Sequence, residues 1–152
     1  MLTNFLNVDN SRSGIWLAPI LLTCILVPFS FVSLALFHIL VELFTIIIAV
    51  MSFFVAWHTF PLSRNTTLLF LGCGYFWVGT IDLLHTLSFE GAELIPAINA
   101  GSTIQFWVMA RYFEAFILLL APFIGKHSFH PYRVMIFLGL LSFMAVIAQF
   151  ND

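Results

Sequence analysis

The stretch LALFHILVELFTIIIAVMSFFVAWHT, residues 34–59, decides the fold class of this chain. A helix needs about 20 mostly apolar residues to cross the hydrocarbon core of a bilayer, and this run exceeds that length. It ends two residues before Pro61, which cannot donate a backbone hydrogen bond inside a helix. We therefore expect a membrane-spanning helix over residues 34–59.

Four similar apolar runs follow the same pattern, and proline or glycine falls mostly at their ends. They cover residues 15–31, 67–87, 102–124 and 132–150. The expected fold is all-α: an integral membrane bundle of about five transmembrane helices, forming a single module over residues 1–152. Gly72, Gly74 and Gly79 lie within one run and would allow its helix to approach neighbouring helices closely.

Composition supports a lipid environment and excludes several classes of protein. Apolar residues make up 62% of the 152 residues, charged residues only 8%, and the mean hydropathy is +1.09. Soluble domains carry about 25% charged residues, so an ordinary soluble domain and a disordered tail are excluded. The formal net charge of -2 offers no basic face for a nucleic acid. The expected partner is the lipid bilayer, and Cys24 and Cys73 are interpreted as packing residues.

The distribution of basic residues predicts an orientation, because lysine and arginine favour cytoplasmic loops. With five spans, one side of the membrane receives Arg12, Arg64, Lys126 and Arg133, and the other receives Glu90, Glu93 and Asp152. We expect the N-terminus in the cytoplasm and the carboxyl end outside.

Six ionisable residues fall inside the expected spans, where each costs roughly 2.5–3.5 kcal/mol by insertion scales. They are His38, Glu42, Asp82, His85, Arg111 and Glu114. They form three pairs with a spacing of three or four residues, so each pair shares one helix face. The orientation predicts that the two His/carboxylate pairs lie at similar depth in the outer half of the bilayer, with the arginine just below.

Three interpretations of this cluster remain open from the residues alone. Arg111 and the carboxylates can form a structural ion-paired clasp between helices. They can instead form a site that binds a ligand or a proton. Further candidate residues for such a site are Gln105, Tyr75 and Thr45. A third interpretation is a metal or haem site, whose possible ligands are His38, Glu42, Asp82 and His85. The nearby arginine and the lack of HExxH or CxxC motifs argue against the third.

Three separated motifs resemble the third family of bacterial membrane-associated sensor domains. They are FHILVELF at residues 37–44 followed by FVAW at 54–57, GTIDLLHTL at 79–87, and TIQFW at 103–107 continuing to ARYFEA at 110–115. The resemblance covers residues 37 to about 121, with the motifs in order. It implies that His38, Glu42, Asp82, His85, Arg111 and Glu114 are signature positions of the family.

The resemblance implies a non-enzymatic sensory input domain in the bacterial inner membrane. Related proteins join such domains to cytoplasmic outputs, including histidine kinases, diguanylate cyclases and PAS domains, so two-component or cyclic-di-GMP signalling is expected. Homodimers are implied on the same basis, and so are further spans and an output domain beyond residue 152. Two other functions remain open: an intramembrane metal or haem protein acting as a hydrolase or redox centre, and a fragment of an ion or proton transporter.

Overall fold

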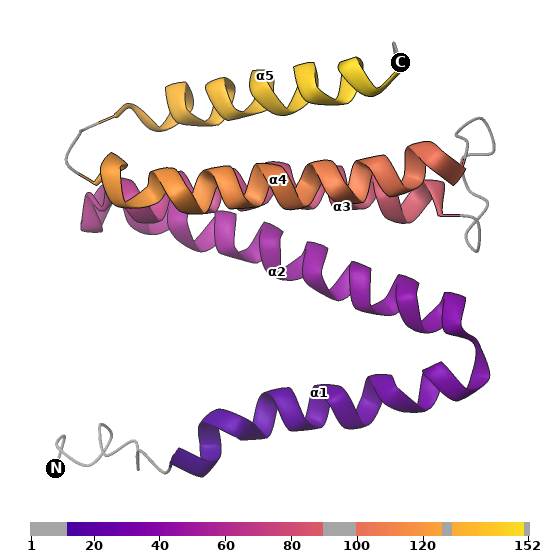
Figure 1. Ribbon diagram of the computed structural model, residues 1–152. Coiled ribbons are helices and arrows are strands. Elements are labelled where there is room, and N and C mark those ends of the chain that lie inside the picture. The colour runs from indigo at the N-terminus through magenta and orange to yellow at the C-terminus, as the bar shows by residue number, and fades with distance from the viewer. Residues whose placement is uncertain (1–11, 90–99, 126–128, 151–152) are drawn as a thin grey trace, which may run out of the picture. The chain divides into compact units, whose positions relative to one another are not determined.

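The computed structural model describes residues 12–89, 100–125 and 129–150. Those residues form five α-helices and no strand (Figure 1). The helices are α1 (Arg12–Val32), α2 (Leu34–Ser63), α3 (Thr66–Ser88), α4 (Ala100–Ile124) and α5 (Pro131–Phe150). The prediction of an all-α fold is confirmed.

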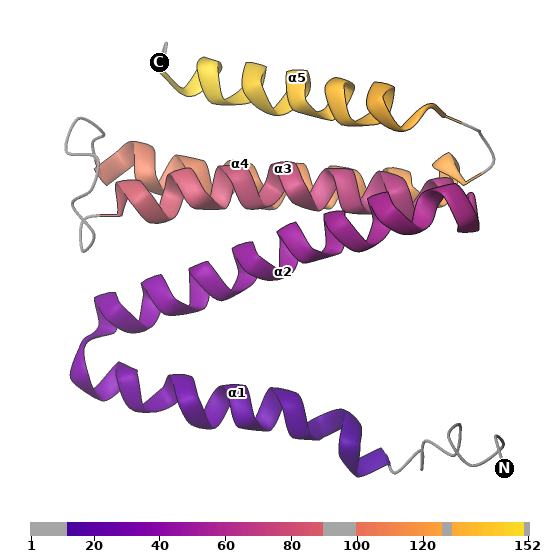
Figure 2. The ribbon, with the colours of Figure 1, turned by 180° about the vertical axis from the view of Figure 1, so that it is seen from behind.

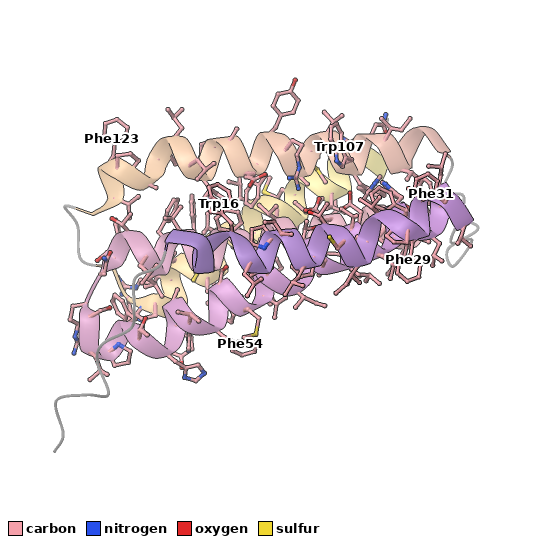
Figure 3. All side chains as sticks on the ribbon, turned by 90° about the horizontal axis from the view of Figure 1, so that it is seen from below. Trp16, Phe29, Phe31, Phe54, Trp107 and Phe123 are labelled. Atoms are coloured by element: carbon pink, nitrogen blue, oxygen red, sulfur yellow. The ribbon has the colours of Figure 1, made fainter. Side chains whose placement is uncertain are left out.

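The helices α2 to α5 are long and apolar enough to cross a membrane. The apolar part of α1, Trp16–Val32, is shorter. Large apolar side chains lie on the outside of the helices, as Figure 3 shows for Phe54 of α2 and for Trp107 and Phe123 of α4. Such a surface suits lipid, where the backbone polar groups are satisfied within each helix.

The chain divides into two compact units, residues 1–40 and 41–152, and the boundary falls within α2. The first unit contains α1, which has Pro19 and Pro28 in its interior. Each proline removes one backbone hydrogen bond, a loss that membrane-spanning helices tolerate better than soluble ones. The second unit contains the rest of α2 together with α3, α4 and α5.

Helix α3 is the centre of the second unit and has the most buried residues. It lies beside α4 along its length, as the opposite views of Figures 1 and 2 show. Trp77 joins α3 to α5, because its indole N–H donates to the backbone oxygen of Met135 over 3.0 Å. The same ring lies against Gly139, where an added Cβ would be 2.5 Å from the indole.

The glycines of α3 allow two neighbouring helices to approach it closely. An added Cβ on Gly72 would lie 2.4 Å from the Cβ of Ala56 in α2, and one on Gly79 would lie 3.0 Å from that of Ala49. On another face, an added Cβ on Gly74 would lie 2.7 Å from Ile117 of α4. Helix packing in membranes uses such small residues, as the sequence predicted for this segment.

A tight turn joins α2 to α3. Arg64 adopts a left-handed backbone with φ of 51°, and its N–H donates to the oxygen of Phe60 over 2.9 Å. Asn65 then caps α3, because its side-chain oxygen accepts from the N–H of Leu68 over 3.0 Å. The helix was expected to stop at Pro61, but α2 continues to Ser63. A proline in the last turn of α2 removes one backbone donor. The helix still ends regularly, because the left-handed Arg64 that follows donates its N–H to the oxygen of Phe60.

Candidate functional site

Polar side chains from three helices of the second unit meet beside the second half of α3. The helix supplies Tyr75, Asp82 and His85, which are spaced by seven and three residues and therefore share a face. Asp82 and His85 are buried, with only 4% and 6% of their surfaces exposed. Charged and imidazole groups at such burial need partners, so their contacts define the site.

Arg111 of α4 joins two carboxylates. One of its terminal nitrogens, Nη2, pairs with Oδ2 of Asp82 on α3, and the other, Nη1, donates to Oε2 of Glu114 over 2.8 Å. The Asp82 pair crosses between helices, whereas the Glu114 pair lies within α4. The side chain of Asp82 is 6% exposed and that of Arg111 is 41% exposed. The guanidinium is therefore the accessible partner of a buried acid.

A cavity of about 290 Å³ lies against this ion pair. Asp82, Arg111 and Glu114 line it together with residues of α2 and α3. The other lining residues are Thr45, Ile48, Ala49, Ser52, Tyr75 and Val78. Its volume suits a small molecule or a few waters, and its wall combines charged groups with hydroxyl groups.

Two polar atoms of the ion pair have no hydrogen-bond partner among the residues that the structure describes. They are Oδ1 of Asp82, an acceptor, and Nε of Arg111, a donor, and both are inaccessible to solvent. A buried polar group without a partner costs about 1–3 kcal/mol, and more when it is charged. The pair can therefore accept one more hydrogen bond and donate one.

His85 lies one turn further along α3 and is fixed by the first turn of α4. Its Nδ1 is 2.8 Å from the backbone oxygen of Thr103. Because a carbonyl can only accept, Nδ1 must carry the proton. The hydroxyl of Thr103 in turn donates to the backbone oxygen of Ser88 over 2.8 Å. These bonds join the end of α3 to the start of α4 and orient the imidazole.

Glu42 approaches His85 from α2. A carboxylate oxygen of Glu42 and a ring nitrogen of His85 lie within 4.8 Å of each other. Glu42 is partly buried, so its charge is not fully solvated. The second unit thus places an acidic group from α2 beside the oriented imidazole of α3.

The predicted cluster is assembled in part. Glu42, Asp82, His85, Arg111 and Glu114 lie in the second unit and make the contacts described above. Thr45 and Tyr75, which the sequence placed on the same helix faces, line the cavity. Their functional roles remain predictions.

Two other predicted site residues are placed differently. Gln105 is exposed and lines a separate pocket with Tyr112 and Gln149, between α4 and α5. It does not line the cavity beside Asp82. His38 belongs to the first unit, one turn before Glu42 in α2, and its part in a metal site remains a prediction.

Sequence reasoning missed Ser52 and Thr103. Ser52 lies seven residues after Thr45, so its helical spacing was available as a signal. Thr103 contacts His85 through its backbone oxygen, a role that any residue type can fill. No sequence pattern marks such a contact.

The comparisons with known proteins give one positive result. A family model described as a membrane-associated sensor domain, MASE3, matches residues 29–152, which is more than half of the chain. No curated protein and no solved structure matches it. The match includes α2 to α5 and therefore every polar residue of the second unit described above. This chain belongs to the MASE3 family of membrane-associated sensor domains.

Proposed function

We propose that this sensor domain detects its signal in the 290 Å³ cavity, through the ion pair of Asp82 and Arg111. The observation that carries the proposal is that Asp82 and Arg111 both line this cavity, while Oδ1 of Asp82 and Nε of Arg111 have no hydrogen-bond partner among the described residues. A small polar ligand that donates to the first and accepts from the second satisfies both. Ionisable groups within membrane spans mark functional sites by default, which supports the same assignment.

Ligand binding would act on the contact between α3 and α4. The Asp82–Arg111 pair joins these helices, and a ligand that competes for either partner weakens the connection. Arg111 keeps Glu114 as a partner when Asp82 is released, so the second arrangement is not prohibitively costly. A signal shifts the balance between two arrangements only by its difference in affinity for them.

We also propose the cellular setting that the sequence predicts. The domain lies in the bacterial inner membrane with its N-terminus in the cytoplasm. The domain has no catalytic activity of its own and acts as a homodimer. In proteins that carry a cytoplasmic output domain, it transmits the change in helix packing to that domain. The four long apolar helices and the family match support the membrane sensor itself.

The test uses a protein in which this domain is joined to its output domain, with output activity measured in membrane vesicles. Asp82→Asn and Arg111→Gln should each change basal output by about fivefold or more, because allosteric coupling amounts to at least that factor. Ser142→Ala is the control, since this buried hydroxyl donates locally to the oxygen of Gly139 in α5. Unchanged output in both variants, at wild-type membrane levels, would contradict the proposal.

A further inference from the structure

Within α2, α3 and α4, the part of the second unit that holds the polar cluster, acidic side chains outnumber Arg and Lys side chains. Glu42, Asp82 and Glu114 lie within α2, α3 and α4, and Arg111 is the basic side chain among them. With every one of these groups ionised, three carboxylates and one guanidinium sum to two negative charges. Uncompensated charge in a membrane interior is costly, so this region favours a cation.

The cation has an evident position beside Glu42 and His85. Arg111 already occupies one oxygen each of Asp82 and Glu114, whereas a carboxylate oxygen of Glu42 lies within 4.8 Å of a ring nitrogen of His85. A carboxylate oxygen and a ring nitrogen within 4.8 Å of each other are close enough to share one ion. Neither residue lines the cavity of the ion pair, so this position is separate from the proposed signal site.

The orientation of His85 is the second observation that points to a ligand. Its Nδ1–H is held by the backbone oxygen of Thr103, which leaves Nε2 as the nitrogen with the lone pair in the neutral ring. Metal-ligating histidines commonly donate their other ring N–H to a backbone carbonyl or a carboxylate, which fixes the ring and raises its basicity. His85 has that arrangement.

We propose that Glu42 and His85 bind a divalent transition-metal ion of the Zn²⁺ class in the second unit. Imidazole and carboxylate ligands suit Zn²⁺, Fe²⁺ and Co²⁺. An ion of charge two offsets the two excess carboxylates, and its remaining positions are open to water. The ion connects α2 to α3, whereas the Asp82–Arg111 pair connects α3 to α4.

The test titrates the purified chain in lipid nanodiscs after chelator treatment, with Zn²⁺ followed by calorimetry and Co²⁺ by visible absorption. One equivalent per chain is expected, with a Co²⁺ spectrum of nitrogen and oxygen ligands. Glu42→Gln and His85→Gln should each weaken binding by about tenfold or more, which is at least the effect of losing an outer partner of a metal ligand. Circular dichroism and gel filtration establish that each variant is folded.

Glu114→Gln is the matched control, because it removes the same charge from the same unit outside the Glu42–His85 pair. It should weaken binding less than Glu42→Gln does, because Glu114 contributes to the excess charge but does not ligate the ion. Equal weakening by Glu114→Gln and Glu42→Gln would show a general charge effect and overturn the site. Absence of stoichiometric Zn²⁺ and Co²⁺ binding by the folded wild-type chain would also overturn it. Because output activity is not measured, either failure leaves the signal site at Asp82 to its own test.

Discussion

Removing Arg111 should destabilise the second unit more than removing the charge of Asp82. The reason is the difference in exposure: the Asp82 side chain is 6% exposed and that of Arg111 is 41% exposed. Arg111→Gln leaves a buried carboxylate without its cation. Asp82→Asn leaves Arg111 paired with Glu114, and the new amide oxygen can still accept a hydrogen bond.

The magnitudes follow from these two situations. Breaking a buried ion pair from one side costs about 3–5 kcal/mol in soluble proteins. Polar contacts between membrane helices are worth less, because the unfolded chain in the membrane also finds partners. We therefore expect about 2–4 kcal/mol for Arg111→Gln and about 1 kcal/mol for Asp82→Asn. The double variant should be less destabilised than the sum by about 1–2 kcal/mol.

The assay is a double-mutant cycle of unfolding free energies in mixed micelles of a mild detergent and sodium dodecyl sulfate. Tyr112→Phe serves as a control, because Tyr112 is 74% exposed on α4 and should change stability by less than about 0.5 kcal/mol. Equal costs for the two single variants, with additivity within about 0.5 kcal/mol, would refute the reasoning. The two side chains would then not depend on each other for their stability.

Three further predictions concern the packing and orientation of α3 and its neighbours. Gly72→Ala should destabilise the protein by about 1–3 kcal/mol in the same unfolding assay, since its Cβ would lie 2.4 Å from that of Ala56. Gly79→Ala should destabilise the protein much less, because its Cβ would lie 3.0 Å from that of Ala49. If Ala56→Gly does not restore the stability lost in Gly72→Ala, this account is wrong. Asn65→Ala should destabilise the protein by about 1 kcal/mol, because the α3 cap is lost. Arg64→Gly should stabilise it by about 1 kcal/mol, because Arg64 has a left-handed backbone that glycine adopts without strain. Equal effects of the two substitutions would rule out the described turn. Arg64→Cys, in a chain that also carries Cys24→Ser and Cys73→Ser, should react with an impermeant maleimide only from the cytoplasmic side. Labelling from the outside would reverse the expected orientation.

The helices were predictable because lipid simplifies the relation between sequence and structure. In a bilayer each backbone group bonds within its own helix, so the length of an apolar run nearly determines the helix. The end of α2 departs from this rule, because the sequence favoured a stop at Pro61 and the helix continues to Ser63. That end depends on the left-handed backbone of Arg64, and arginine as a residue type does not indicate this conformation.

The site was predictable where helical spacing alone decides which residues share a face. Asp82 and His85 on α3, and Arg111 and Glu114 on α4, follow from spacings of three. Which acid Arg111 reaches on another helix depends on packing between helices, and spacing does not contain that information. Gln105 shows the same limit, because it lies on the α5 side of α4, away from the cavity beside Asp82.

Arg111 binds one carboxylate through Nη2 and another through Nη1, and this division affects how the helices can separate. One acid belongs to the neighbouring helix and the other to the arginine's own helix, one turn away. Neutralising Asp82 therefore removes the ion pair between α3 and α4, while the cation remains balanced on α4. Neutralising Glu114 does the reverse and commits the cation to α3. The same arginine can be tuned toward a looser or a tighter bundle, depending on which of two carboxyl groups receives a proton or a ligand.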